Sequence, residues 1–599
     1  MRGVIFAAAL SLMMGCSNTK QASDKFVQWP KAYRPIFYKE QLPKENYAEG
    51  MKIAISTSGK GSALVAKEIQ EKGGNLVDVS VALAFALSVE RPHDLGLGGG
   101  GFLLYKPANL DIPISLDFRE RASLELNSKK LLAKVPKKIN KDLLEKQRPF
   151  DSQIELPYED AIATPGMVKG LIKFHREFGK LPLAQLLAPA IKLAEKGITV
   201  SSELSKAIED NKEKLSKDSR AKSIYFKENG SVYLPGEILV QKDLAKTLNE
   251  VSQSGDKSFY EGKISQEFVN ALKGKLSLAD FKSYKVKRPE VLKTQFNGHN
   301  FYTMGPPSSG GISLIQALKV LEKSELRNLA PMHPKAIHKT VSALQFAAVD
   351  RAKYLGDPDY TTLRLNKMIS EDYIEDLYKA IPEHMHLNYS EASFDFMNTR
   401  FKAPYESAET AQISLMDSDG NTVVMTLGLN GVFGSGVVAG STGIVMNSAL
   451  KSFNYHPKKI FIVGPDMGKN NLAEPGKAPI SNMAPTIITD QKDMPVLSIG
   501  ATGGNQIPSC LGQTILNLME YKLPVKDSLL VKRYHHQWMP DEIVFESMKL
   551  PKRVKERLVI MKHDMKFEDL KCRVQFVKRN GEKLQALSDP RGESISWAN

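Results

Sequence analysis

Cysteine is scarce in this sequence: its 599 residues include three, Cys16, Cys510 and Cys572. Their spacing matches neither a disulfide framework nor a zinc motif, although the last two could still form one pair. The H-E-x-x-H motif of helical zinc sites is absent. Two adjacent histidines, His535 and His536, would point apart on a strand or helix and chelate poorly. We therefore predict no catalytic metal and no cofactor.

Apolar runs of membrane-spanning length are also missing. The run at the N-terminus, residues 4–14, follows an early arginine and precedes Gly-Cys16, which is the layout of a secretory signal. A small residue before cysteine resembles a bacterial lipoprotein cleavage site. This resemblance implies a signal peptide over residues 1–16, lipidation of Cys16, and a tether and N-terminal extension over 17–50. We expect an exported, periplasmic, lipid-anchored protein; a simple cleaved signal is the alternative.

A concentrated basic stripe is missing as well. The formal net charge is +15, but lysines are spread widely, and their densest cluster, residues 129–146, has helical spacing and no aromatics. Surfaces that bind nucleic acid usually combine both features, so we predict a solvated helix face and no nucleic-acid partner. The chain is too long for one compact core, and two or more substructures are expected.

Helix and strand patterns alternate in the first part of the chain, and the part after residue 405 is β-rich. Apolar periodicity predicts strands at 52–57, 102–107 and 113–118, helices at 61–73, 75–90 and 333–355, and a mostly helical region over 181–322. Two later hairpins are predicted, one around Asp419-Gly420 and one joining 484–490 to 495–501. A Gly-Gly turn then leads into a helix. This order indicates sheets covered by helices.

Three short motifs resemble functional signatures but lack the required context. The glycine run 96–101 follows a predicted helix and precedes a strand, which is the reverse of a dinucleotide site. The S-x-x-K motif at 448–451 lacks its S-D-N and K-T-G companions. Ser308 and Ser309 lie in a Pro-Pro-Ser-Ser-Gly-Gly stretch without the G-x-S-x-G elbow of hydrolases. We assign no catalytic role to any of the three.

Thr410 stands between a polar run and a strand-like alternation. A threonine hydroxyl is a weak nucleophile unless a base lies beside it, and an N-terminal threonine carries that base in its own α-amino group. The unperturbed pKa of such an amine is about 8. To expose it, the chain must be cut between Glu409 and Thr410. From the local pattern alone, an ordinary threonine at the start of a strand is the simpler interpretation.

Many ordered sequence blocks resemble the γ-glutamyltranspeptidase family. They include LGLGGGGFLL, LDFRER, MGPPSSGGISLIQALKVLE, TAQISLMDSDGN, PISNMAPTI, GATGGNQI and SDPRG, and the resemblance extends over about nine-tenths of the chain. It implies an α+β, four-layer αββα sandwich of the N-terminal-nucleophile hydrolase type, with a mainly helical region in the large-subunit part. It also implies a precursor that cuts itself before Thr410, giving a large subunit, 51–409, and a small subunit, 410–599.

The resemblance also implies roles for individual residues. Thr410 would be both the autoprocessing residue and the nucleophile, and the backbone N–H groups of Gly503 and Gly504 would stabilise the oxyanion, a large term in such catalysis. Arg119 would grip the substrate α-carboxylate, which suits its planar, bidentate guanidinium. The remaining positions matched to substrate binding are Ser481, Asn482, Asn430 and Ser452.

The sequence departs from the family at several of these positions. Gly428 stands where the family has a second threonine, and the family's usual residues are also replaced by Gln412 and Asn482. Ala449 and Ser452 replace the groups that hold the substrate α-ammonium. A polar group left unpaired in a tight site costs about 1–3 kcal/mol. The carboxylate half of the glutamyl pocket is therefore expected to be kept and the ammonium half altered.

Three functions are consistent with these residues. The first is a γ-glutamyltranspeptidase-like enzyme, a γ-glutamyltransferase or glutathione hydrolase, which transfers the acyl group of glutathione and similar amides to water or amino acids. The second is an acylase-like enzyme that uses carboxylated acyl groups without an ammonium, such as glutaryl. The third is a non-catalytic relative that binds a ligand. Thr410, Arg119 and the Gly503–Gly504 pair favour the enzymes.

Overall fold

Two antiparallel sheets form the centre of the computed structural model, which describes residues 29–134, 156–386, 410–454, 468–538 and 540–599. The larger sheet has seven strands, in the order β1 (Tyr47–Gly50), β17 (Lys583–Ser588), β16 (Arg573–Asn580), β12 (Pro495–Thr502), β11 (Thr486–Thr489), β8 (His299–Thr303) and β7 (Leu292–Phe296). The smaller has six strands, in the order β18 (Ser594–Ala598), β2 (Ile53–Ser58), β9 (Ala411–Asp417), β10 (Thr422–Gly428), β3 (Gly100–Lys106) and β4 (Ile114–Asp117).

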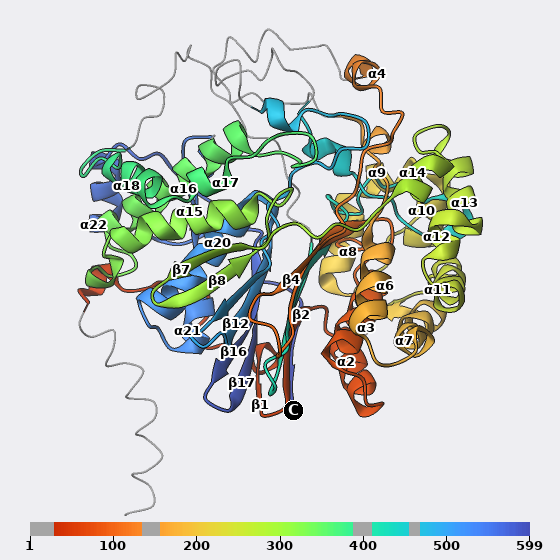
Figure 1. Cartoon of the computed structure of the whole chain (residues 1–599), viewed down its shortest axis with the longest axis horizontal. Helices are drawn as coiled ribbons and strands as arrows, with labels where there is room; N and C mark the ends of the chain where they lie inside the picture. The colour runs from red at the N-terminus through yellow and green to blue at the C-terminus, as the bar shows by residue number, and fades with distance from the viewer. Residues whose placement is uncertain (1–28, 135–155, 387–409, 455–467, 539) are drawn as a thin grey trace, which may run out of the picture.

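The sheets pack face to face, and helices cover both outer faces, as Figure 1 shows with the strands between two helical layers. On the six-stranded sheet lie α2 (Ser62–Glu71), α3 (Leu76–Glu90) and α6 (Met167–Phe178). On the seven-stranded sheet lie α15 (Gly310–Lys323) and α20 (Ile507–Ile515), with α16 (Pro334–Tyr354) packed outside α15. The predicted four-layer αββα sandwich is confirmed.

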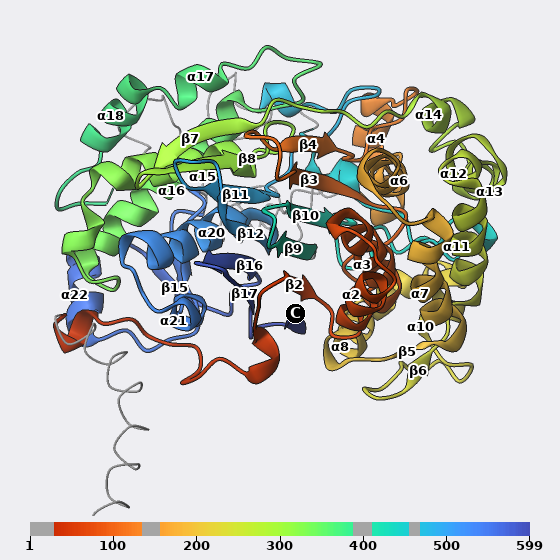
Figure 2. The same ribbon diagram turned by 60° about the horizontal axis from the view of Figure 1, so that its bottom comes forward.

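Further helices extend the layer beside the six-stranded sheet, away from the sheets (Figure 2). They are α7 (Leu183–Lys196), α8 (Ser202–Asp210), α9 (Lys212–Ser216), α10 (Ser219–Tyr225), α11 (Lys242–Ser254), α12 (Lys257–Glu261), α13 (Lys263–Leu272) and α14 (Leu278–Ser283). The remaining helices are α4 (Ser128–Lys134), α17 (Leu365–Met368), α18 (Glu371–Lys379), α21 (Val525–Leu530) and α22 (Lys552–Ile560). There are also two small sheets. One contains β13 (Tyr534–His535), β14 (Ile543–Phe545) and β15 (Met565–Phe567), and the other pairs β5 (Ile198–Thr199) with β6 (Ile238–Leu239).

Burial explains the composition of the central elements. Helix α3 is buried from Leu76 to Val89, and it is apolar nearly all round because it packs on the sheet, α2, α6 and α7. Its N-terminus is closed by a capping box, in which Asn75 and Asp78 each accept the backbone N–H of the other. Strands β3 and β10 are buried along their whole length because a helix layer covers one face and the second sheet the other.

Strand register brings several chain segments to one end of the sandwich. In the six-stranded sheet, Ala411 pairs with Leu427, and Gly428 pairs with Gly100. The start of β9, the end of β10 and the start of β3 therefore share one end, with the end of β4 beside them. In the seven-stranded sheet, Thr486 pairs with both Ile499 and Thr303, so the end of β12, the start of β11 and the end of β8 also meet.

Within the described ranges, none of the helices combines the length and the apolar character needed to cross a membrane. Most of the predicted strands and helices are present within one to three residues of their expected bounds. The predicted signal peptide, Cys16 and Glu409 lie outside the described residues, as do residues 455–467.

Candidate active site around Thr410

Thr410 directly precedes β9, a central strand of the six-stranded sheet, and is 6% exposed. Its hydroxyl oxygen is buried and has no hydrogen-bond partner among the described residues. It lines a cavity of about 270 Å³ together with Thr502, the last residue of β12 in the other sheet. A buried hydroxyl without a partner is uncommon because its desolvation is not offset. Thr410 therefore has a buried hydroxyl without a described partner, at the edge of a cavity.

Gly503 and Gly504 follow Thr502 and lead into α20. Their φ angles are 125° and 54°, both in the region that favours glycine. A Cβ added to Gly503 would lie 2.6 Å from the Cα of Cys572, so a side chain does not fit there. The two glycines thus turn the chain at the positive end of a helix dipole, where backbone N–H groups are suited to an oxyanion.

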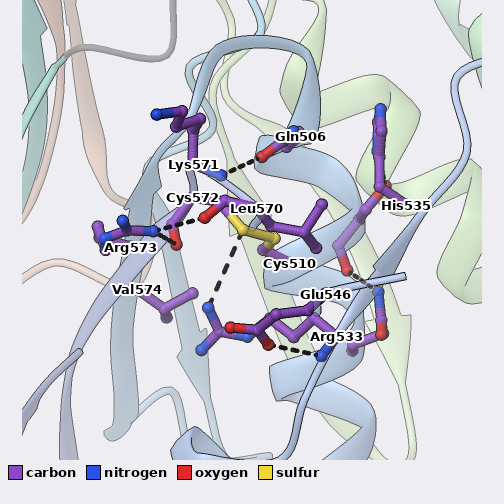
Figure 3. The surroundings of a disulfide bond; sticks show 12 residues. Gln506, Cys510, Arg533, His535, Glu546, Leu570, Lys571, Cys572, Arg573 and Val574 are labelled. Atoms are coloured by element: carbon purple, nitrogen blue, oxygen red, sulfur yellow. Dashed lines mark hydrogen bonds between the residues drawn. A yellow bond between two sulfur atoms is a disulfide. The ribbon is translucent and has the colours of Figure 1, made fainter. Parts of the chain in front are cut away.

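A disulfide between Cys510 and Cys572 lies close to this turn, because Cys572 is the residue that a side chain at Gly503 would meet. Figure 3 shows the residues around the disulfide. Cys510 lies on α20, and Cys572 precedes β16. Both residues are fully buried. Beside the bridge, the backbone N–H of Lys571 donates to Gln506 Oε1 at 2.7 Å. The pairing that the sequence left open is therefore present, and it fixes the helix that follows the glycine turn to the neighbouring strand.

Replacing both cysteines by serine is expected to weaken stability and catalysis together. Closing a loop of 62 residues stabilises a fold by roughly 4 kcal/mol in the chain-entropy account. We expect Tm to fall by several degrees and kcat to fall several-fold as the turn at Gly503 loosens. Calorimetry and steady-state kinetics on Cys510→Ser/Cys572→Ser measure both. An unchanged kcat with a lowered Tm would show that the bridge stabilises the fold without positioning the turn.

Arg119 follows β4 and is completely buried. Its guanidinium donates to Glu120 Oε2 at 3.0 Å, to Asn430 Oδ1 at 3.0 Å and to the carbonyl of Pro479 at 3.3 Å. These bonds use three of its five N–H groups and leave one on each terminal nitrogen. A carboxylate that pairs in a bidentate manner accepts two N–H groups, so these two are sufficient to bind one. Burial raises the pKa of Glu120, although the Arg119 charge opposes the shift.

The loop that carries Arg119 is fixed by a buried ion cluster. Arg121 donates to Asp117 at 2.5 Å and to Asp357 at 2.8 Å. Asp117 also accepts the backbone N–H of Arg119 at 2.7 Å, and Asp357 accepts that of Ala478 at 2.8 Å. The cluster therefore holds the Arg119 loop against the segment that leads to Ser481. No role for these positioning residues is predicted from the sequence.

Ser481 and Asn482 lie on a loop before β11. The Ser309 hydroxyl donates to the carbonyl of Ser481 at 2.8 Å and to Asn482 Oδ1 at 3.1 Å. The amide of Asn482 donates to Asn505 Oδ1 at 2.6 Å, directly after the glycine turn. Ser309 is therefore a scaffold for the loop, and Asn482 connects the loop to the glycine turn.

Asn430 adopts φ 60°, a left-handed conformation that asparagine tolerates better than most residues. Its Oδ1 accepts from Arg119 at 3.0 Å and from the Ser452 hydroxyl at 2.9 Å, and its Nδ2 donates to the carbonyl of Ser448 at 3.0 Å. The side-chain oxygen nearest Arg119 is thus already occupied by two donors. Ala449 is buried among apolar side chains and offers no side-chain acceptor.

The structure brings nearly all of the predicted site residues to one end of the two sheets. Arg119, Asn430 and Ser452 form one hydrogen-bonded group. Gly428, at the end of β10, contributes no side-chain hydroxyl near Thr410. His535 contacts Ser509 and His536 faces Asp541, so the adjacent histidines do point apart. No group of three or more His, Cys, Asp or Glu in the described ranges is arranged to hold a metal ion.

The cavity at Thr410 is rich in charge of both signs. Its basic side chains come from Arg91, Lys206, Lys571 and Arg573, and its acidic ones from Asp94, Glu203, Asp210 and Glu593. Arg91 is bound by Asp94 at 2.6 Å and by Glu203 at 2.8 Å, so it is largely neutralised. Such a lining is suited to a zwitterionic or polar molecule better than to an apolar one.

Comparison with known proteins agrees with this geometry. The family model described as Gamma-glutamyltranspeptidase matches residues 62–598. The "Glutathione hydrolase proenzyme" of Escherichia coli K12 is 33% identical over 504 residues, 83% of each chain. The protein of the same name from Pseudomonas aeruginosa is 30% identical over 559 residues, 90% of this chain and 94% of the relative.

Solved structures show the same fold. The cephalosporin acylase from Bacillus halodurans superposes with a TM-score of 0.79 at 23% identity, covering 94% of this chain and 99% of the acylase. The γ-glutamyltranspeptidase of Helicobacter pylori is 32% identical, with a TM-score of 0.50 over 55% of this chain and 92% of that one. With a family model that matches nearly the whole sequence, this chain belongs to the γ-glutamyltranspeptidase family of N-terminal-nucleophile hydrolases.

Proposed function

We propose that the chain is a precursor that cuts itself between Glu409 and Thr410, and that the small subunit then uses Thr410 to cleave γ-glutamyl amides such as glutathione. The acyl group passes to water, an amino acid or a peptide. Residues 51–409 form the large subunit and residues 410–599 the small one. The observation that carries the proposal is the buried hydroxyl of Thr410, which has no partner among the described residues and belongs to a residue that lines the cavity next to the Gly503 turn.

The chemistry follows from the position of one hydroxyl. In processing, Thr410 Oγ1 attacks the carbonyl carbon of Glu409, the peptide nitrogen takes up a proton and leaves, and water hydrolyses the resulting ester. In turnover, the freed α-amine accepts the hydroxyl proton while Oγ1 attacks the γ-carbonyl of the donor. The N–H groups of Gly503 and Gly504 stabilise the oxyanion. The amine leaves with a proton, and water or an acceptor amine then cleaves the acyl ester.

The donor is held by its carboxylate in this proposal. Arg119 supplies its two remaining N–H groups, and the Ser481 loop lies beside it through the bond to Pro479. The leaving group and the acceptor occupy the charged cavity that Thr410 shares with Lys571 and Arg573. A dipeptide leaving group has one free carboxylate and one amine, which matches a lining with charges of both signs.

A second candidate is an acylase-type reaction on acyl groups that have a carboxylate but no ammonium, such as glutaryl amides. The hydrogen bonds of Asn430 favour it, because Arg119 and Ser452 both donate to the oxygen that would otherwise accept from an ammonium. Export as a lipoprotein through Cys16 is also part of the proposal. The mass of the N-terminal peptide from membrane-isolated protein tests that part.

The wild-type protein provides the direct test. We expect the purified chain to give two fragments that meet at Glu409–Thr410, by intact mass, and to release aniline from a γ-glutamyl anilide. A single uncut chain that persists for days would contradict the proposed function. If glutaryl anilide is used as well as or better than γ-glutamyl anilide, the second candidate replaces the first.

A further inference from the structure

Helix α22 lies at the surface beside the first described residues of the chain. Val554 and Leu558 form its buried stripe and belong to one apolar cluster, against which Tyr33 and Ile36 of the N-terminal segment pack. The backbone of that segment is fixed as well, because the N–H of Lys532 donates to the carbonyl of Ile36 at 2.7 Å. Figures 1 and 2 both show α22 at the edge of the molecule, next to the start of the described chain. The helix and the N-terminal segment therefore share one side of the protein.

The exposed surface of α22 and its flanks is strongly basic. Between residues 549 and 562, six basic side chains stand against one acidic side chain, Glu556, and all six are exposed. They are Lys549, Lys552, Arg553, Lys555, Arg557 and Lys562. Lys552 lies 3.8 Å from Glu556, and within the described residues the other five cations form no salt bridge. This surface therefore attracts anions.

Large apolar side chains are exposed at the C-terminal end of the same helix. Val559 is 55% exposed and Ile560 is 64% exposed. Met385 is 51% exposed, and it precedes His386, whose backbone N–H donates to the carbonyl of Met561 at 2.6 Å. Single exposed apolar residues are ordinary on a soluble protein. Several of them near one end of a basic helix are typical of surfaces that enter the interfacial region of a membrane.

The length of chain before the first described residue places a membrane within reach of α22. With Cys16 lipidated as proposed, residues 17–28 separate the lipid from Trp29. A chain of this length extends to at most about 45 Å. The next residues, up to Ile36, already pack on the cluster that holds α22. The anchor would therefore keep α22 concentrated near the membrane surface, where a weak attraction is sufficient for docking.

We propose that α22 docks on anionic phospholipids, with its basic side chains against the lipid phosphates and with Val559 and Ile560 inserted beneath the headgroups. The inference rests on one part of the proposed function, the lipidation of Cys16, and it does not involve Thr410. A nucleic acid would also attract the cations, but it has no use for an exposed aliphatic pair. Residues 549–562 also contain no aromatic side chain on which a base could stack. An anionic membrane fits both the charge and the apolar end of the helix.

Vesicle binding by the chain from Ser17 to Asn599, which carries no lipid, tests the docking separately from the anchor. We expect it to bind phosphatidylglycerol vesicles at least tenfold more tightly than phosphatidylcholine vesicles at about 0.1 M salt. It should be released at about 1 M salt, where the Debye length falls from about 10 Å to about 3 Å.

Two sets of substitutions assign the binding to α22. In Arg553→Gln/Lys555→Gln/Arg557→Gln, affinity for phosphatidylglycerol should fall at least tenfold, because each basic side chain near an anionic surface strengthens binding about fivefold. Glutamine is as good a helix former as lysine or arginine, so the helix should persist. In Val559→Ser/Ile560→Ser, affinity should fall several-fold, because less apolar surface leaves water.

The matched control is Lys212→Gln/Arg220→Gln/Lys222→Gln, which removes three charges from exposed side chains of α9 and α10. These helices lie on the opposite side of the molecule from α22 (Figure 1). The control should bind vesicles like the wild type, and Tm verifies that each variant is folded. Equal binding to both kinds of vesicle, an equal loss in the control and the α22 variants, or equally tight binding to duplex DNA would overturn the docking surface.

Failure of the anchor would give a different result from failure of the docking surface. An N-terminal peptide without lipid, from a chain whose α22 still binds phosphatidylglycerol, would overturn the proposed lipidation and the tethering step. A lipidated chain whose Ser17–Asn599 form binds neither kind of vesicle would overturn the docking surface and leave the lipidation standing.

Discussion

Replacing Thr410 with alanine is expected to leave the chain as one uncut precursor without detectable transfer activity. Alanine removes the oxygen that attacks the Glu409 carbonyl in processing and the donor carbonyl in turnover, so both reactions stop at once. Removal of a nucleophile costs at least about 10⁴-fold in rate, and the uncut chain also lacks the α-amine that would act as base. Intact mass and anilide hydrolysis measure the two effects.

Two further variants make the result specific. Thr410→Ser keeps a hydroxyl at the same position and should still be cut and still turn over donor. Thr422→Ala changes another buried threonine at the far end of the same hairpin, where Thr422 pairs with Met416. It should be processed like the wild type. A Thr410→Ala chain that is still cleaved at the same bond would remove Thr410 from the processing reaction.

The sequence contains enough information to predict the layers and the position of Thr410 but not the partners of individual atoms. Strand and helix periods are local, and antiparallel hairpins fix the register of neighbouring strands. For this reason β9, β10, β11 and β12 were found near their expected bounds. The occupation of Asn430 Oδ1 depends on Arg119 and Ser452, which lie 311 and 22 residues away in the chain. Such contacts follow from the assembled sheets, not from spacing.

Side chains whose burial comes from distant segments were missed for the same reason. Lys214 has the sequence surroundings of an ordinary surface lysine between Glu213 and Leu215, and it becomes half-buried when α9 packs on the Val432 loop. Ser309 has no nucleophile motif around it in the sequence. In the structure its hydroxyl donates to the carbonyl of Ser481 and so fixes the Ser481 loop. Cys510 and Cys572 are 62 residues apart, so their pairing depends on how α20 crosses β16.

Arg119→Lys is expected to reduce kcat/KM for carboxylate-bearing donors by about 100-fold or more. Lysine keeps the positive charge beside Glu120 but replaces a planar fork by a single ammonium, so it cannot hold Asn430, the Pro479 carbonyl and a bidentate carboxylate together. Each hydrogen bond lost to a charged group costs about 1.5–3 kcal/mol, and 1.4 kcal/mol is a tenfold change. Most of the loss should fall on KM, because the carboxylate is bound before and during the reaction.

An acyl anilide without any carboxylate, such as pentanoyl anilide, separates the loss of carboxylate binding from a general disruption of the active site by the substitution. The wild-type enzyme should use it poorly, and Arg119→Lys should use it equally poorly, because the lost interaction never formed. The ratio of kcat/KM between the wild-type enzyme and Arg119→Lys is therefore measured on glutaryl anilide and on pentanoyl anilide. The difference between the two ratios isolates the carboxylate contact, as in a double-mutant cycle. An equal loss on both substrates, with an unchanged Tm, would mean that Arg119 acts through the Asn430 network and does not bind the donor.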